Sequence, residues 1–129
     1  MARILIAEDE PSVRDFITRA LKGAGHEVEA VVDGSDALAA LARARARGEP
    51  HELLLTDILM PVMDGISLAL SAARDAPGLP IVLMTGYSDQ RERAYGLEAI
   101  IRDILLKPFT LAELLARIDA VLEAPMPPR

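Results

Sequence analysis

Residues 53–65 read Leu-Leu-Leu-Thr-Asp-Ile-Leu-Met-Pro-Val-Met-Asp-Gly, an apolar run that ends in a carboxylate and then meets turn residues. A short apolar run with this boundary is typical of a buried strand, because helices need roughly 10–12 residues. In such a strand, an acidic residue at the end lies at the edge of the sheet. Asp57 is therefore the first candidate for a functional residue. On this stretch alone, the alternative that Asp57 simply begins a turn stays open, because aspartate is a common turn former.

The composition narrows the possible functions. At 129 residues the chain fits one domain that buries roughly two thirds of its unfolded surface. The absence of cysteine excludes disulfides and thiolate chemistry. The net charge of −6 and the four aromatic residues disfavour a nucleic-acid surface. No apolar run approaches the ~18 residues of a membrane span, and no leader pattern follows Met1. We therefore expect a cytoplasmic protein that binds neither DNA nor a membrane.

Strand and helix signals alternate along the chain. Apolar runs predict strands at residues 3–7, 27–32, 53–57, 80–84 and 104–106. Apolar spacings of three and four predict helices at 11–24, 35–47, 66–73 and 110–122, with a marginal helix at 87–96. The expected organisation is one domain, residues 1–124, followed by a proline-rich tail, residues 125–129.

This alternation predicts an α/β fold with a parallel sheet covered on both faces. In such sheets, ligands bind outside the carboxyl ends of the strands, where the strand order reverses. If the strand order is 2-1-3-4-5, the residues that leave four neighbouring strands converge on one crevice. These residues are Glu8, Asp9, Asp57, Thr85 and Lys107.

Three carboxylates in one pocket repel one another unless a pKa is raised or a cation is bound. With only oxygen ligands available, Mg²⁺ is the natural cation. The combination predicts a phosphoryl-transfer site in which Asp57 is the nucleophile and forms an acyl phosphate. We expect Asp9 to hold Mg²⁺, helped by Glu8 directly or through water, with the backbone carbonyl of Leu59 as a further ligand.

The two remaining polar residues of the crevice complete this site. Lys107 would offset the carboxylates in the resting state and bind a phosphoryl oxygen afterwards. Thr85 would donate its hydroxyl to another phosphoryl oxygen. We interpret His26 and His51 as surface residues beside turns, and Asp64 as the cap of the helix that follows it.

Four separated motifs resemble the signature of the receiver domains of two-component response regulators. They are Glu8-Asp9, Asp57 in Leu-Thr-Asp-Ile-Leu-Met-Pro-Val-Met-Asp-Gly, Thr85 in Met-Thr-Gly-Tyr and Lys107 in Leu-Lys-Pro-Phe. The resemblance covers essentially the whole chain. It implies a flavodoxin-like (βα)5 three-layer sandwich of strand order 2-1-3-4-5 and a cis peptide before Pro108. It also implies that Asp57 is phosphorylated with Mg²⁺ by a histidine kinase or histidine phosphotransfer protein and is then slowly hydrolysed, without other enzymatic activity.

A narrower resemblance concerns the segments Ala-Glu-Asp-Glu at 7–10 and Gln-Arg-Glu-Arg-Ala at 90–94. Together with the stretch around Asp57, they are similar to the stand-alone regulators of the CpdR type found in alphaproteobacteria. Because no output domain is evident in the sequence, we expect a single-domain regulator whose helix 4/strand 5/helix 5 face acts on a separate effector protein. The narrower resemblance implies that this partner belongs to cell-cycle or regulated-proteolysis control. A phosphate relay or sink is the alternative role.

Two positions depart from the receiver pattern. Glu8 stands where the family usually has aspartate, which gives the side chain one methylene more of reach. Ile104, three residues before Lys107, stands where many receivers carry an aromatic that swings inward on activation. This puts an aromatic switch in doubt.

Alternatives from other classes have weaker support. A phosphatase of the haloacid dehalogenase type needs a second aspartate two residues after the nucleophile, where this chain has Leu59. A receiver-like module that binds partners without phosphorylation would not need the intact acidic set. A nucleotide-binding flavodoxin-like module would need a glycine-rich phosphate motif, which the sequence lacks.

Overall fold

The structure is a computed structural model, and it describes residues 1–86, 96–97 and 99–123. Five parallel strands form one sheet of order β2-β1-β3-β4-β5, as the family resemblance implies. The strands are β1 Arg3–Ala7, β2 Glu27–Val31, β3 Leu53–Asp57, β4 Ile81–Thr85 and β5 Asp103–Leu106. The described helices are α1 Pro11–Gly23, α2 Gly34–Ala46, α3 Gly65–Asp75 and α5 Leu111–Glu123. The marginal helix and the proline-rich tail that the sequence predicts fall largely or wholly outside the described residues.

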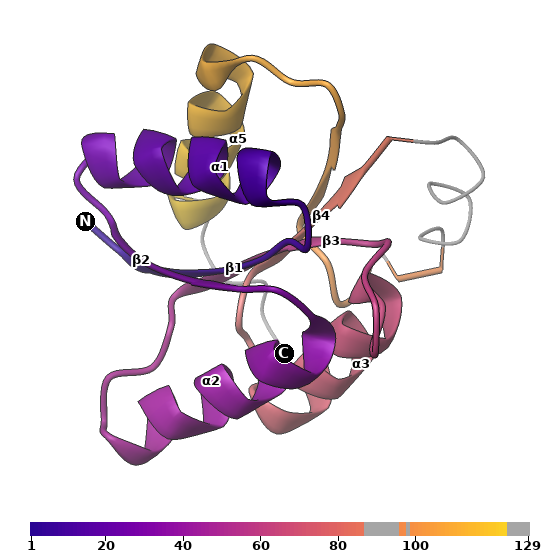
Figure 1. Cartoon of the computed structure of the whole chain (residues 1–129). Coiled ribbons are helices and arrows are strands. Elements are labelled where there is room, and N and C mark those ends of the chain that lie inside the picture. Colours follow the sequence, from indigo (N-terminus) through magenta and orange to yellow (C-terminus); the bar gives the residue numbers. More distant parts are fainter. Residues whose placement is uncertain (87–95, 98, 124–129) are drawn as a thin grey trace.

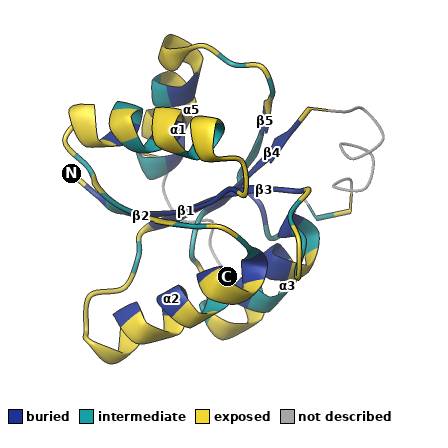
Figure 2. Cartoon of the chain, in the orientation of Figure 1, coloured by how far each residue is buried: buried dark blue, intermediate teal, exposed yellow. Residues whose placement is uncertain are grey.

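The helices form two layers on opposite sides of the sheet. Helices α1 and α5 cover one face, and α2 and α3 cover the other (Figure 1). Strands β3 and β4 are buried at every position, which explains why they are continuous apolar runs instead of alternating ones. Figure 2 shows the buried residues gathered in the central strands and on the inner helix faces.

Each face of the sheet has its own apolar core. Alternate strand residues point to opposite faces, so Leu55 packs with the α1 and α5 residues and Leu54 with the α2 and α3 residues. Ile17 and Ile118 lie in the first core, and Leu68 lies in the second. None of the helices built from described residues is long and apolar enough to cross a membrane.

Side-chain caps fix where three of the helices begin. The carboxylate of Asp33 accepts a hydrogen bond from the N–H of Asp36 at 2.8 Å, at the start of α2. Asp64 does the same for the N–H of Ser67 at the start of α3, which confirms its predicted role as a cap. Thr110 and Glu113 exchange two hydrogen bonds of 3.1 Å, a capping box before α5. The caps at α2 and α3 place both helices directly after loops at the carboxyl edge of the sheet.

The two histidines lie just before strands, His26 before β2 and His51 before β3. Nε2 of His51 lies 3.0 Å from Oε1 of Glu29, and the His51 side chain is only 6% exposed. Nδ1 of His26 accepts a hydrogen bond from the N–H of Ala2 at 3.1 Å. The interpretation of His51 as a surface residue was therefore wrong, because the loop before β3 folds its ring against β2.

The loop between β3 and α3 contains a backbone conformation that L-residues rarely adopt. Val62 has φ +70°, and the N–H of Met63 donates to the carbonyl of Pro61 at 2.7 Å. This pairing describes a γ-turn of the rare, strained kind with positive φ at its centre. The Val62 side chain is 83% exposed, so it gains little packing in return.

We predict that Val62→Gly raises the free energy of unfolding by about 1 kcal/mol. Glycine removes the strain of about 1–3 kcal/mol for a non-glycine residue at positive φ, and part of this gain is offset by the larger backbone entropy of glycine in the unfolded chain. Urea unfolding measures the change. Val32→Gly is the matched control, since Val32 is also exposed but has no positive φ. A loss of stability in both variants would contradict the prediction.

Candidate functional site

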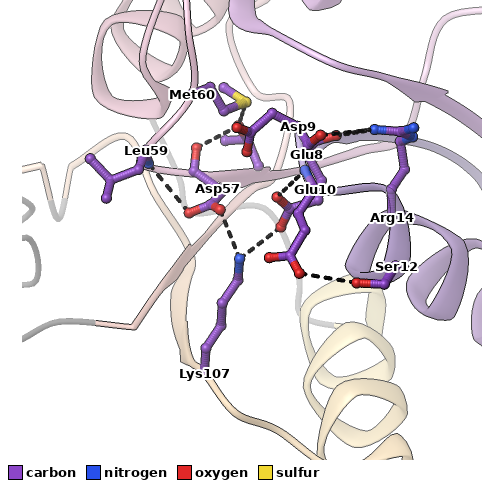
Figure 3. A network of polar contacts seen from close by, with 10 residues as sticks. Glu8, Asp9, Glu10, Ser12, Arg14, Asp57, Leu59, Met60 and Lys107 are labelled. Atoms are coloured by element: carbon purple, nitrogen blue, oxygen red, sulfur yellow. Dashed lines mark hydrogen bonds and ion pairs between the residues drawn. The ribbon is translucent and has the colours of Figure 1, made fainter.

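Asp57 is the last residue of β3, and only 8% of it is exposed. One carboxylate oxygen, Oδ2, accepts a hydrogen bond from Nζ of Lys107 at 2.7 Å. The other, Oδ1, lies 3.3 Å from the backbone N–H of Leu59 (Figure 3). Asp57 is therefore held at the strand end by the loop on one side and by a cation on the other.

The same ammonium group contacts a second buried acid. Nζ of Lys107 lies 2.7 Å from Oε1 of Glu8, which is fully buried. The second carboxylate oxygen of Glu8 accepts the N–H of Glu10 at 3.1 Å. Lys107 thus bridges two carboxylates that come from the ends of β1 and β3. This confirms that the predicted strand ends converge.

Burial and charge act in opposite directions on these groups. Burial raises the pKa of Glu8, although its hydrogen bonds from Lys107 and from the Glu10 N–H act against that rise. Burial by itself would lower the pKa of Lys107, but the hydrogen bonds to Asp57 and Glu8 outweigh it and raise this pKa. Lys107 therefore remains a cation at neutral pH and offsets part of the negative charge of the site.

Three carboxylates come close enough to share one cation. Oxygens of Glu8, Asp9 and Asp57 all lie within 4.8 Å of one another. With the ammonium of Lys107, the cluster has two net negative charges when all three acids are ionised. Its donors are oxygens, and Asp9 is exposed to solvent. This donor set fits Mg²⁺, a hard cation that binds one or two carboxylates and keeps several waters.

A cavity of about 800 Å³ opens above these groups. The acids and Lys107 line its polar side, and it continues over an apolar side between α1 and the start of α5. Phe16 and Phe109 lie on that side with ring centroids 6.3 Å apart. Asp57 therefore lines an open cavity that solvent can enter.

Thr85 lies at the end of β4, fully buried, as the strand pattern predicts. Its backbone carbonyl accepts the N–H of Lys107 at 2.8 Å. The Lys107–Pro108 peptide is cis, as the family resemblance implies. Ile104 is partly buried and packs against the α2–α3 core. A hydrogen bond from the Thr85 hydroxyl to a phosphoryl oxygen, and the Leu59 carbonyl as a metal ligand, stay predictions.

Two residues that shape this site, Arg14 and Gly65, were not predicted from the sequence. Arg14 donates from Nη1 to the backbone carbonyls of Glu8 at 2.9 Å and Asp9 at 3.3 Å. Gly65 lies so close to β3 that a Cβ atom there would overlap the carbonyl oxygen of Asp57. The available signals were an arginine in the first turns of a helix, whose side chain points back toward the helix start, and a glycine directly after a helix cap.

Comparison with known proteins now identifies the family. A family profile described as the response regulator receiver domain matches residues 4–119. The chain belongs to the receiver domain family of response regulators. The predicted family and fold are thereby confirmed.

Curated relatives of this receiver domain are longer proteins. The response regulator MprA of Mycobacterium leprae is 40% identical over 125 residues, which are 97% of this chain and 53% of MprA. The DNA-binding response regulator MtrA of Mycolicibacterium smegmatis is 37% identical over 118 residues, which are 92% of this chain and 49% of MtrA. The chain thus spans about half the length of these relatives.

Solved structures of similar size share the fold. The chemotaxis response regulator CheY4 of Vibrio cholerae superimposes with a TM-score of 0.80 at 28% identity, over 94% of this chain and 98% of CheY4. A response regulator from Chloroflexus aurantiacus gives a TM-score of 0.83 at 30% identity, over 95% of this chain and 98% of that one.

We predict that Gly65→Ala lowers the free energy of unfolding by about 3 kcal/mol, because the added methyl group forces α3 away from β3. Gly23→Ala is the matched control. No atom lies within 4 Å of a Cβ built at Gly23, and alanine there favours the helix by about 0.5 kcal/mol. Chemical unfolding of both variants measures the two changes. Equal effects of the two substitutions would disprove the close approach at Gly65.

We predict that Lys107→Met lowers the free energy of unfolding by about 2 kcal/mol near neutral pH. The substitution leaves two buried carboxylates without their cation. Such a change costs about 3–5 kcal/mol for a fully buried pair, and we expect a smaller cost here because the Lys107 side chain is 22% exposed. The loss shrinks as pH falls through the raised pKa of Glu8, because the protonated acid no longer needs a cation. It also shrinks at alkaline pH, as wild-type Lys107 deprotonates above its own raised pKa.

Thermal and chemical unfolding across pH measure this dependence. Lys22→Met is the control, since Lys22 is an exposed lysine in the last turn of α1. A deficit in Lys107→Met that stays constant from acid to neutral pH would argue against pairing with the buried acids.

Proposed function

We propose that the protein is a phosphoryl-accepting signalling switch in which Asp57 takes a phosphoryl group from a histidine kinase or a histidine phosphotransfer protein. The observation that carries this proposal is the Lys107 ammonium, which lies 2.7 Å from the carboxylates of both Asp57 and Glu8. Asp9 completes an acidic group beside it. This arrangement prepares a nucleophile, a counterion and a cation site in one open cavity.

In the proposed reaction, a carboxylate oxygen of Asp57 attacks the phosphorus of a phosphohistidine. The new P–O bond forms as the P–N bond breaks, and the imidazole leaves with the bonding electron pair and takes up a proton. Mg²⁺, held by Asp57 and Asp9 with help from Glu8 and the Leu59 carbonyl, would supply positive charge to the phosphoryl oxygens. Lys107 then binds a phosphoryl oxygen, and Thr85 donates its hydroxyl to another.

The phosphoryl group changes the charge around Lys107. It adds up to about two negative charges, so Lys107 exchanges its contact with Asp57 for one with the new oxygens. Lys107 directly follows β5 and precedes the turn into α5, so we propose that the β5–α5 surface transmits the change. Part of the predicted helix 4/strand 5/helix 5 face lies outside the described residues.

We propose that the downstream partner of this domain is a protein. The net charge of −6 disfavours direct contact with DNA. The relative MtrA is named as a DNA-binding response regulator, but this chain matches only about half of the length of MtrA. We therefore do not extend DNA binding to this chain. A stand-alone role in cell-cycle or proteolysis control, as the resemblance to the CpdR type implies, stays a prediction, and so does a cytoplasmic location.

We propose no enzymatic activity beyond self-phosphorylation and slow self-dephosphorylation. Among the described residues that line the cavity there is no histidine to act as a general base for rapid hydrolysis. A phosphate sink uses the same chemistry and differs only in lacking an effector. A binding module that is never phosphorylated is the competing proposal.

Intact mass after incubation with acetyl phosphate tests the proposal. In MgCl₂ we expect a gain of one phosphoryl group on the wild type, with none in EDTA, because the phosphoryl oxygens need the cation. Asp57→Asn should show no gain. Asp33→Asn, which removes a capping carboxylate at the start of α2, is the matched control and should be phosphorylated normally.

The lifetime of the acyl phosphate follows from the decay of the added mass. If folded wild-type protein gains no mass at any time, and its amide resonances do not respond to beryllium fluoride, the phosphoacceptor proposal fails. The phosphorylation-independent binding module would then be the better account.

A further inference from the structure

The loop that carries Glu8 and Asp9 is not fixed by a conventional helix cap. Glu10 is the N-cap residue of α1, and its side chain makes no capping hydrogen bond. The N–H of Glu8 donates to the carbonyl of Val31 at 3.0 Å, which ties the start of the loop to β2. The backbone carbonyls of Glu8 and Asp9 take their hydrogen bonds from other donors.

Arg14 supplies those donors from α1. Its Nη1 nitrogen lies 2.9 Å from the Glu8 carbonyl and 3.3 Å from the Asp9 carbonyl (Figure 3). The guanidinium is planar, and its N–H groups have fixed directions. Two successive carbonyls bound to one nitrogen restrict the two peptides on either side of the Asp9 Cα atom, Glu8–Asp9 and Asp9–Glu10. Because these peptides flank Asp9, their orientation sets the direction in which the Asp9 side chain leaves the loop.

Asp9 depends on its backbone more than the other two acids do. Lys107 and the Glu10 N–H hold the carboxylate of Glu8, and Lys107 and the Leu59 N–H hold that of Asp57. The Asp9 carboxylate is exposed and has no such contact with any residue that the structure describes. Its position beside the other acids therefore rests on the conformation of the loop.

We propose that Arg14 is a positioning residue for Mg²⁺ binding, which acts by holding the Glu8–Asp9 backbone so that the Asp9 carboxylate faces the site. This inference rests on the proposed Mg²⁺-dependent phosphorylation. Arg14 touches neither the cation nor the reacting atoms, so its effect passes through Asp9.

The charge of Arg14 and its positioning role have opposite effects on Mg²⁺ affinity. A guanidinium near the site repels a cation, so removal of its charge alone would strengthen Mg²⁺ binding. Loss of positioning weakens binding, and residues that support metal ligands typically contribute about 10-fold or more in affinity. The sign of the change therefore separates the two roles.

Amide chemical shifts of the full chain, titrated with MgCl₂ at constant ionic strength, measure the dissociation constant. We expect Arg14→Ala to raise it about 10-fold and Arg14→Lys to raise it less, because an ammonium keeps the charge and reaches one carbonyl. Arg19→Ala is the matched control. Arg19 is on the same helix, is 80% exposed and pairs with Asp15, so its loss should leave the constant within about twofold at moderate salt.

Phosphorylation by acetyl phosphate gives a second readout. The Arg14→Ala protein should need about 10-fold more Mg²⁺ for half-maximal phosphorylation, yet reach the wild-type level when Mg²⁺ is saturating. Thermal unfolding in EDTA reports on the fold. A purely structural role for Arg14 would lower the unfolding temperature and leave the Mg²⁺ dissociation constant unchanged.

An unchanged or lower dissociation constant in Arg14→Ala overturns the proposal, and so does an equal weakening in Arg19→Ala. If Arg14→Ala does not fold, an unchanged constant in Arg14→Lys overturns it instead. If the wild-type protein neither responds to MgCl₂ nor gains a phosphoryl group, the proposed function itself is wrong. That outcome is seen without any substitution and is therefore distinct from a failure of the Arg14 proposal.

Discussion

The ammonium of Lys107 between two buried carboxylates is the interaction on which the site depends. Glu8 and Asp57 lie at the ends of neighbouring strands, and their like charges repel in a region with little solvent. Lys107 joins them from the end of β5, at the edge of the sheet. The pairing links residues that are 99 and 50 positions apart in the sequence, so it exists only when the whole sheet has formed. The site thus follows from the topology and does not come from any local segment.

The exact position of Asp57 also depends on close packing behind it. Gly65 begins α3, and its N–H donates to the carbonyl of Ile58 at 2.8 Å. Gly34 begins α2 in a similar way, with its N–H 3.2 Å from the carbonyl of Met63. A Cβ at Gly34 would lie 2.7 Å from that same carbonyl oxygen. The first residues of two helices therefore make close contacts with the β3–α3 loop. The strained residue Val62 lies in this same loop.

Most of the fold and the central residues of the site could be predicted from the sequence. The apolar runs locate the strands from local sequence alone. The rule that ligands bind at the carboxyl ends of parallel strands then places Asp57, Asp9 and Lys107 at one edge. The sequence predicts that Lys107 offsets the carboxylates, but not that Glu8 is fully buried with its second oxygen bound to the Glu10 N–H, because reach and burial depend on the packed structure. Arg14 was missed for a related reason. Its contacts are to backbone carbonyls, which leave no complementary charge in the sequence.

Glu8 binds two donors within the protein, whereas the sequence suggests that it binds a metal ion. We expected it to help hold Mg²⁺, but one of its oxygens contacts Lys107 and the other contacts the Glu10 N–H. Both oxygens thus already have a donor, whereas Asp9 is exposed and has none among the described residues. Of the two acids that follow β1, Asp9 is therefore more accessible to a cation than Glu8. Asp9 is therefore the acid of the site whose position depends most on the loop backbone that Arg14 contacts.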